Sequence, residues 1–130
     1  DPVNYISLSD SLMERGDIDL ALNWSPKDAA LSEEVISKIK SRPVVFESKG
    51  IKSLGAFLLE CDLLITLQGG AMHIAAALKT PTIAIFDKTD PDVWHPWGEG
   101  HVVLKSGNNP NLVTVKDVID AVNKMFGEKP

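Results

Sequence analysis

One segment of this sequence, Thr66 to Leu78, has residue types that bind an anion through the backbone. A short apolar run ends there, Gly69 and Gly70 follow, and a stretch of small residues suited to a helix begins. Glycines at a helix start let a ligand approach, and the unpaired N–H groups and helix dipole favour an anion such as a diphosphate. His73 is expected in the first helical turn, beside that anion. The alternative is an ordinary strand-to-helix turn with a structural histidine.

The segment 86–98 is rich in carboxylates, which can act as acid and base or bind a metal ion. Around Pro91, however, they are better explained as turn formers. They are Asp87, Asp90 and Asp92. His95 and His101 do not have zinc-ligand spacing with any partner. We therefore predict no metal site.

Two tryptophans, Trp94 and Trp97, lie in the same segment. Indole rings can stack on the face of a sugar, which would place them beside a carbohydrate ligand. We favour a structural role instead, in which they cover the edge of the sheet.

A third segment, Asn23 to Asp28, carries a possible ribose ligand. Ser25 as N-cap, Pro26 at the first helical position and Asp28 as the third residue resemble a capping box, which explains them fully. The alternative is that Asp28 binds ribose hydroxyls, as acidic residues at strand ends do in dinucleotide-binding folds.

Strands and helices must alternate to position these segments. Apolar residues at helical spacing predict helices near residues 4–15, 31–39, 54–61 and 115–126, and Thr114 with Asp117 predicts a capping box before the last. Continuous apolar runs predict strands at 18–22, 43–46, 63–66, 82–86 and 102–104. This order indicates a Rossmann-like, doubly wound α/β sheet of parallel strands with helices on both faces.

Size and composition limit the function. The chain has 130 residues, of which 44% are hydrophobic and 24% charged, which suits a single domain over residues 1–130. A net charge of −5 without a basic cluster argues against nucleic acid as a partner. Cys61 is the only cysteine, expected to be buried and inert, and its isolation suits a cytoplasmic protein. No apolar run is long enough to span a bilayer.

Taken together, these segments resemble the C-terminal signature of the ADP-heptose:lipopolysaccharide heptosyltransferase family. The likeness rests on five runs and is densest between residues 62 and 98. They are Gly69-Gly70-Ala71-Met72-His73-Ile74-Ala75-Ala76-Ala77-Leu78, Thr80-Pro81-Thr82-Ile83-Ala84-Ile85-Phe86, Thr89-Asp90-Pro91, Trp94-His95-Pro96-Trp97-Gly98 and, more loosely, Trp24 to Asp28 with Ser53-Leu54.

The resemblance implies the C-terminal, donor-binding half of a GT-B glycosyltransferase. Such an enzyme inverts the anomeric centre while it transfers heptose, or a related sugar, from ADP-heptose to a lipopolysaccharide core acceptor. The N-terminal domain, absent from this chain, is expected to supply the general base and to bind the lipid-linked saccharide. This chain alone would then bind the donor without turnover or cofactor. The parent protein is expected in the cytoplasm, and the inner face of the bacterial inner membrane is one location where it could act. At most peripheral membrane association is expected.

The resemblance also assigns roles to residues. Gln68, Gly69, Gly70 and His73 would bind the donor diphosphate, where the glycine backbone and His73 would stabilise the leaving group. Asp28, Ser53 and Leu54 would contact the nucleoside. Thr89 and Trp94 would form the mouth of the pocket.

Two departures from the family pattern leave a second hypothesis open. Gln68-Gly69-Gly70 stands where the family has Asp-Ser/Thr-Gly, which removes a carboxylate and a hydroxyl. Phe86-Asp87-Lys88-Thr89 stands where it has Phe-Gly-Pro-Thr, which adds charges. The sugar would then differ from heptose, or the chain would be a non-catalytic, glycosyltransferase-derived interaction module of an envelope-biosynthesis protein.

Overall fold

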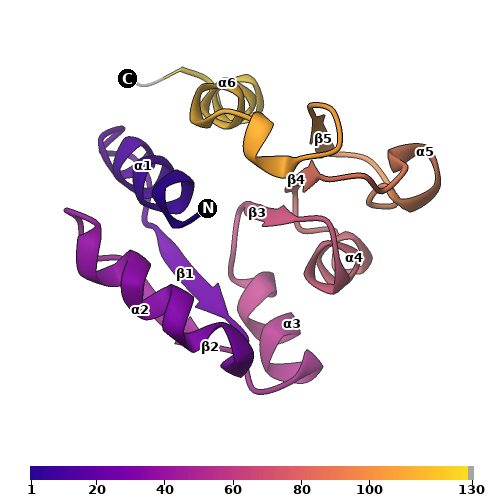
Figure 1. The fold of residues 1–130 in the computed structure, drawn as a ribbon. Helices are drawn as coiled ribbons and strands as arrows, with labels where there is room; N and C mark the ends of the chain where they lie inside the picture. The colour runs from indigo at the N-terminus through magenta and orange to yellow at the C-terminus, as the bar shows by residue number, and fades with distance from the viewer. Residues whose placement is uncertain (129–130) are drawn as a thin grey trace. The chain divides into compact units, whose positions relative to one another are not determined.

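The computed structural model describes residues 1–128 as an α/β protein whose strands are all paired in parallel (Figure 1). The chain divides into two compact units, residues 1–49 with the C-terminal segment from Thr114, and residues 50–113. The alternation of helices and strands confirms the predicted fold class. Hydrogen bonding divides the strands into a parallel pair and a parallel trio, one in each unit.

The first unit is built on the strands β1 (Ala21–Trp24) and β2 (Val44–Glu47), which pair in register from Ala21 opposite Val44. Its helix α1 packs against both α2 and α6. The buried apolar side chains that hold these helices together include Leu12, Val35, Val118 and Val122. The helical elements are α1 (Pro2–Met13), η1 (Pro26–Asp28), α2 (Ala29–Lys38) and α6 (Val115–Phe126).

The second unit contains a sheet in the order β3-β4-β5, with β4 in the middle. Helix α4 packs on β3 and β4, and α3 packs on α4. Met72 of α4 is fully buried with Ala84 and Phe86 of β4, so one helix covers the central strand. The elements are α3 (Ile51–Leu59), β3 (Leu64–Leu67), α4 (Gly70–Ala77), β4 (Thr82–Phe86), α5 (Pro91–Trp94), β5 (His101–Lys105) and η2 (Pro110–Leu112).

Local sequence signals set most of these boundaries. Thr114 and Asp117 form the predicted capping box, and α6 begins directly after it. The prediction of a strand at 18–22 was placed too early, because β1 runs from 21 to 24. The residue pairing with β2 begins only at Ala21 opposite Val44, so residues 18–20 precede the paired strand.

The capping prediction at Ser25 is partly wrong. Pro26 does begin a helical turn, but the Ser25 side chain makes no capping bond to the backbone. Its hydroxyl instead donates to the Asp28 carboxylate at 2.7 Å. The hydroxyl is therefore a donor to a charged acceptor, a strong type of hydrogen bond, and not the acceptor of a backbone N–H that a capping box requires.

Two further predictions concern Cys61 and membrane-spanning helices. Cys61 is half-buried, its Sγ donates to the Phe57 carbonyl at 3.3 Å, and burial, with the charges of Asp62 and Glu60, raises its pKa. The prediction that Cys61 is buried is therefore wrong, but its raised pKa keeps the group a thiol, as expected for an unreactive cysteine. Among residues 1–128, no helix has the length and apolar character needed to cross a membrane.

Candidate functional site

The candidate site lies at the carboxyl edge of the sheet in the second unit, where ligands bind in open α/β folds. β3 and β4 end side by side, with Leu67 opposite Ile85. The Gln68 backbone N–H then donates to the Ile85 backbone carbonyl at 2.8 Å, so the parallel pairing extends one residue past the strand. This bond brings the start of α4 next to the loop that follows β4.

The start of α4 is open to a ligand. Gly69 is its N-cap with φ +156°, a conformation that side chains rarely adopt. Apart from adjoining backbone, no heavy atom of residues 1–128 lies within 4 Å of where a Cβ would stand at Gly69 or Gly70. The first helical N–H groups have no partner within a helix, and Gly69 has no side chain to cap them. These features together suit an anion.

A line of hydrogen bonds crosses from β3 to the loop after β4. Gln68 Nε2 donates to Thr89 Oγ1 at 3.2 Å, and Thr89 donates from both its hydroxyl and its backbone amide to Asp87 Oδ1, each at 2.8 Å. Lys105, at the end of β5, donates through Nζ to the backbone carbonyl of Asp87 and to that of Thr89 at 3.5 Å. The loop is therefore held from both neighbouring strands.

The charge of Asp87 fixes the direction of these bonds. The backbone and hydroxyl hydrogen bonds from Thr89 lower the pKa of Asp87, and Lys105 lowers it further. An ionised carboxylate only accepts hydrogen bonds, so the single Thr89 hydroxyl proton must go to Asp87. The Thr89 oxygen then accepts from Gln68, which orients the Gln68 amide.

His73 and Trp94 form a second contact at this edge. Their ring centroids lie 6.5 Å apart with the planes at 68°, an edge-to-face arrangement. His73 is exposed in the first turns of α4, and Trp94 is 54% exposed. The structure thus brings one predicted diphosphate ligand next to one predicted residue of the pocket mouth.

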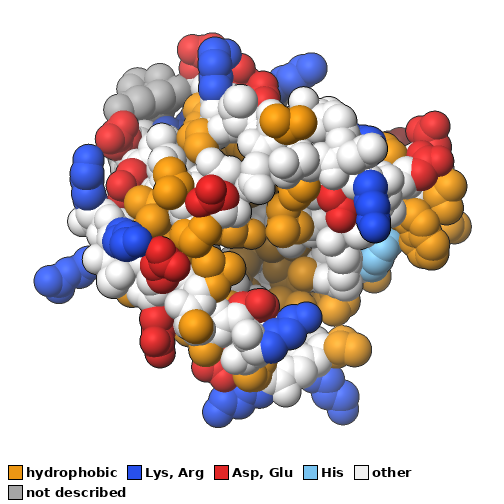
Figure 2. Space-filling view, viewed as in Figure 1, with side chains coloured by type: hydrophobic (Ala, Val, Ile, Leu, Met, Phe, Trp, Pro, Cys, Tyr) orange, Lys and Arg blue, Asp and Glu red, His pale blue; other side chains and the backbone are white. Residues whose placement is uncertain are grey.

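The tryptophans do not cover the edge of the sheet, so that prediction was wrong. Trp97 is 77% exposed, and with Val93 and Trp94 it contributes to the hydrophobic side chains over α5 (Figure 2). Pro96 is buried, whereas Trp94 and Trp97 on either side of it are exposed. The turn-forming role is confirmed for Asp90, which caps α5 by accepting from the Asp92 amide at 2.9 Å, and for Asp87, which accepts from the Thr89 amide at 2.8 Å.

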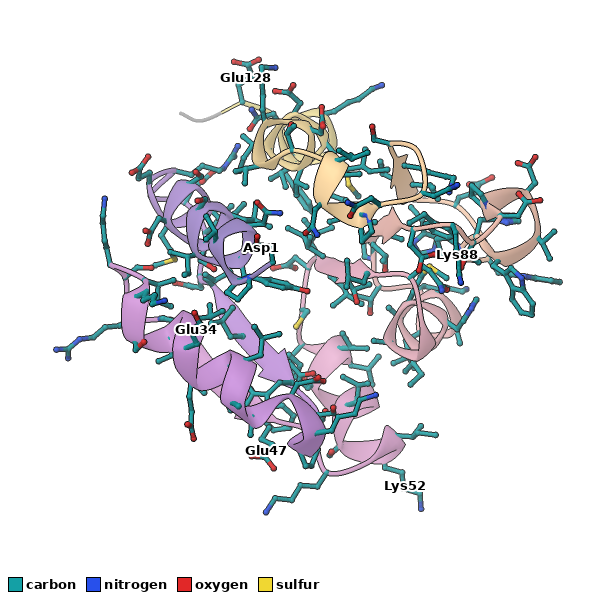
Figure 3. All side chains as sticks on the ribbon, in the orientation of Figure 1. Asp1, Glu34, Glu47, Lys52, Lys88 and Glu128 are labelled. Carbon is teal, nitrogen blue, oxygen red and sulfur yellow. The ribbon has the colours of Figure 1, made fainter. Side chains whose placement is uncertain are left out.

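A small pocket of about 80 Å³ opens between the ends of β3 and β4. Two polar residues and three apolar ones line it. They are Gln68, Asp87, Leu67, Ile85 and Pro110. Lys88, labelled in Figure 3, is exposed on the loop that follows β4. Within residues 1–128 no group of three or more His, Cys, Asp or Glu side chains is placed to hold a metal ion.

Two of the predicted nucleoside ligands, Ser53 and Asp28, have local hydrogen-bond partners. Ser53, in the first turn of α3, donates to the Gly50 carbonyl at 3.1 Å, and Leu54 is half-buried beside it. Asp28 belongs to the first unit, where it accepts from Ser25. Its charge also adds to the effect of burial in raising the pKa of Tyr5.

Sequence reasoning missed two residues of the site. Asp87 was interpreted as a turn former and an added charge, and Lys105 was not considered. The signal for Lys105 was available, because it ends its strand as Phe86 ends β4, and the two residues are paired in the sheet. Carboxyl ends of neighbouring parallel strands meet at one edge, so a lysine there reaches the loop beyond β4.

The chain is similar to heptosyltransferases over most of its length. The family model described as glycosyltransferase family 9 (heptosyltransferase) matches residues 2–121. Lipopolysaccharide heptosyltransferase 3 of Escherichia coli is 28% identical over 95% of this chain and 41% of its own length. Lipooligosaccharide heptosyltransferase 2 of Haemophilus influenzae is 27% identical over 78% and 31%. The chain thus spans about two fifths, or less, of these relatives.

Solved structures agree in fold. A family 9 glycosyl transferase from Veillonella parvula superposes with a TM-score of 0.88 at 19% identity, over 96% of this chain and 41% of that one. The structure of Escherichia coli heptosyltransferase WaaC with ADP superposes with a TM-score of 0.85 at 19% identity, over 96% of this chain and 39% of that one. The same enzyme with ADP-2-deoxy-2-fluoro heptose gives 0.77, over 95% and 38%.

Proposed function

Because this chain belongs to glycosyltransferase family 9, the heptosyltransferase family, we propose that it is the donor-binding part of a glycosyltransferase of lipopolysaccharide core synthesis. The donor is ADP-heptose or a related nucleotide sugar. Transfer inverts the anomeric centre, and the acceptor is a lipid-linked saccharide. One solved relative, Escherichia coli heptosyltransferase WaaC, holds ADP in one structure and ADP-2-deoxy-2-fluoro heptose in another, which supports a nucleotide-sugar donor.

One observation carries the proposal, namely the open start of α4 at the carboxyl edge of the sheet. A diphosphate there would accept hydrogen bonds from the N–H groups at and after Gly70 and gain from the helix dipole. His73 lies in the first turns of the same helix, and Gln68 immediately precedes Gly69. Asp28, Ser53 and Leu54 are the residues we propose for the nucleoside.

The chemistry assigned to this chain is stabilisation of the leaving group. As an acceptor hydroxyl attacks the anomeric carbon, the bond to the diphosphate breaks and negative charge accumulates on its oxygen. Backbone donors fixed before the reaction stabilise that charge without reorganising. We propose that the general base and the acceptor site belong to the rest of the parent, that no cofactor or metal takes part, and that the parent works in the cytoplasm with at most peripheral membrane contact.

Titration of the isotope-labelled chain with ADP tests the proposal. The amide signals of residues 69–73 should shift most, and a Gly70→Val variant should weaken ADP binding about tenfold or more. The space around Gly70 lets the valine fit the fold while it occupies the position of the anion. Gly55→Ala is the matched control, because its Cβ would meet only Leu78 Cδ1 at an ordinary 3.7 Å. No shift at millimolar ADP would rule out donor binding by this chain.

A non-catalytic interaction module is the second candidate. It is favoured by Trp97, which exposes 77% of its surface, and by Gln68, which brings no charge and is bonded to Thr89. Glycosyl transfer and donor hydrolysis by the full-length parent separate the two functions. A folded parent that binds no nucleotide and transfers no sugar would favour the interaction module.

A further inference from the structure

The small pocket beside the start of α4 is lined by groups that accept hydrogen bonds. Asp87 accepts both bonds from Thr89, and its ionised carboxylate has no proton to donate. Gln68 donates one of its two side-chain N–H groups to Thr89, so its side-chain oxygen remains available as an acceptor beside one further N–H. The remaining lining residues are apolar. The Asp87 carboxylate therefore favours a ligand group that donates hydrogen bonds and carries no negative charge.

The pocket also limits the size of that group. Its volume of about 80 Å³ is far below the roughly 300–1,000 Å³ of pockets that enclose a whole drug-sized ligand. Only a small arm of a larger molecule can enter. A phosphate is disfavoured by the charge of Asp87, whereas hydroxyl groups on a sugar are neutral, small and able to donate.

Lys105 fixes the backbone of the pocket's loop and makes no direct ion pair with the Asp87 carboxylate. Its ammonium donates to the backbone carbonyls of Asp87 and Thr89 rather than to the carboxylate oxygens. The turn is thus fixed from β5, and the carboxylate is fixed within the turn by Thr89. A carboxylate held in this way is preorganised, so it loses little freedom when a ligand binds.

We propose that Asp87 is a specificity-determining residue that accepts hydrogen bonds from hydroxyl groups of the donor's sugar, with Gln68 as the second acceptor. This inference rests on the proposed function, because the diphosphate must lie at Gly69 and Gly70 for its sugar to reach this pocket. The start of α4 and the pocket then bind different groups of the ligand. The backbone at the start of α4 binds the charged diphosphate, and the acceptors of the pocket bind the sugar. Thr89 is a positioning residue that acts through Asp87.

Calorimetric titration of the chain with ADP and with ADP-heptose tests the proposal. The unaltered chain should bind ADP-heptose more tightly than ADP. Asp87→Asn keeps the shape but removes the charge, so it should weaken ADP-heptose binding about tenfold or more and change ADP binding less than about twofold. Asp92→Asn is the control, because Asp92 lies in the next turn and does not line the pocket. It should leave both affinities unchanged.

Variants at Thr89 separate positioning from folding. Thr89→Val removes the hydroxyl that links Gln68 to Asp87 and should reduce the preference for ADP-heptose over ADP. Thr89→Ser keeps the hydroxyl and should restore that preference. If Asp87→Asn weakens the binding of ADP and of ADP-heptose equally, or changes neither affinity, Asp87 does not bind the sugar. The chain would still bind its donor in that case. If the unaltered chain binds neither ligand, the proposed function and this inference both fall.

Discussion

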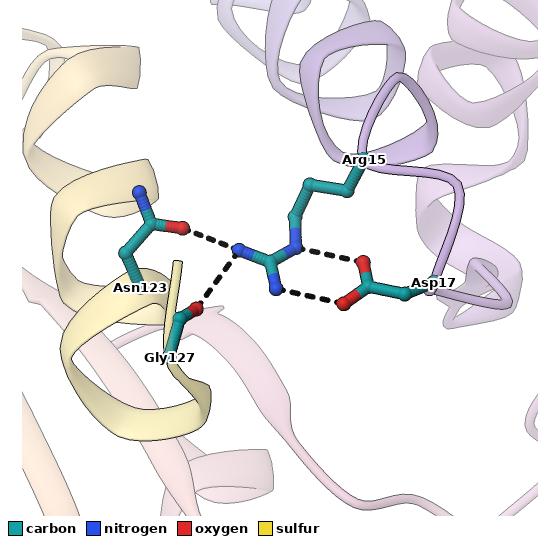
Figure 4. A network of polar contacts seen from close by, with 4 residues as sticks. All are labelled: Arg15, Asp17, Asn123 and Gly127. Atoms are coloured by element: carbon teal, nitrogen blue, oxygen red, sulfur yellow. Dashed lines mark hydrogen bonds and ion pairs between the residues drawn. The ribbon is translucent and has the colours of Figure 1, made fainter. Parts of the chain in front are cut away.

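Each of the two units contains a polar network that joins distant parts of the chain, and the two networks differ in whether they are closed. In the first unit Arg15, with a side chain only 5% exposed, donates from all three guanidinium nitrogens (Figure 4). It binds both carboxylate oxygens of Asp17 at 2.9 Å, the Asn123 side chain, and the Gly127 carbonyl at 3.2 Å. In the second unit the line from Gln68 through Thr89 ends on Asp87 at the wall of a pocket.

The difference separates a structural network from one suited to a ligand. Arg15 is surrounded by protein acceptors, so it fixes the end of α1 to the end of α6 and has little capacity for another partner. Asp87 is fixed by two bonds to one oxygen but lines open space, so it has acceptor capacity left. Polar groups that are fully satisfied within the protein rigidify a fold, whereas those held in place but open can orient a ligand. Three substitutions test this distinction.

Arg15→Leu should have the largest effect on stability. It removes a buried side chain that donates to Asp17, Asn123 and Gly127, so the link between the end of α1 and the end of α6 is lost. We expect Tm to fall by about 5–10 °C in a calorimetric scan. Arg42→Leu is the control, because Arg42 is exposed, and it should change Tm by less than about 2 °C. An equal, small change in both variants would show that the closed network does not stabilise the fold.

Thr114→Ala should have an intermediate effect, because it breaks a network that is closed but exposed. Removing the capping hydroxyl should cost about 1 kcal/mol of unfolding free energy, measured by urea denaturation, while Thr114→Ser should cost little. A cost near zero would mean that closure stabilises only where the network is buried.

The capping box of Thr114 and Asp117 also predicts that the stability of the fold depends on pH. Hydrogen bonds from the Thr114 backbone and hydroxyl lower the pKa of Asp117 below its ordinary value of 3.8. A lowered pKa in the folded state stabilises the fold at pH values above the ordinary value, and this stability is lost as pH falls through the lowered pKa. The loss on acidification should be smaller in Thr114→Ala than in the unaltered chain, as followed by circular dichroism.

Thr89→Val should have the smallest effect on stability although it breaks the open network. Thr89 is only half-buried, and its partners can turn to water. We expect Tm to change by less than about 2 °C, in contrast to the effect on ligand preference proposed above. A fall as large as that of Arg15→Leu would erase the distinction between the two networks.

Several features were predictable from the sequence because their causes are local. The bounds of β4 and the N-terminus of α6 follow from a continuous apolar run and from a capping box within four residues. The alternation of strands and helices, and therefore the α/β class, follows from the spacing of apolar side chains. The position of Gly69 and Gly70 at a helix start was also predicted, while anion binding there stays a prediction. Helix N-termini carry unpaired N–H groups whatever the rest of the fold does.

Contacts between distant residues were decided only by the tertiary structure. Gln68 and Thr89 are 21 residues apart and Arg15 and Asn123 are 108 apart, and no local pattern marks either pair. Sequence spacing specifies which face of a strand or helix a side chain occupies, but not which other element lies against it. The parallel pairing of β3, β4 and β5 is what brings Gln68, Asp87 and Lys105 to one edge. There, an aspartate that resembles an ordinary turn former becomes a fixed acceptor beside the start of a helix.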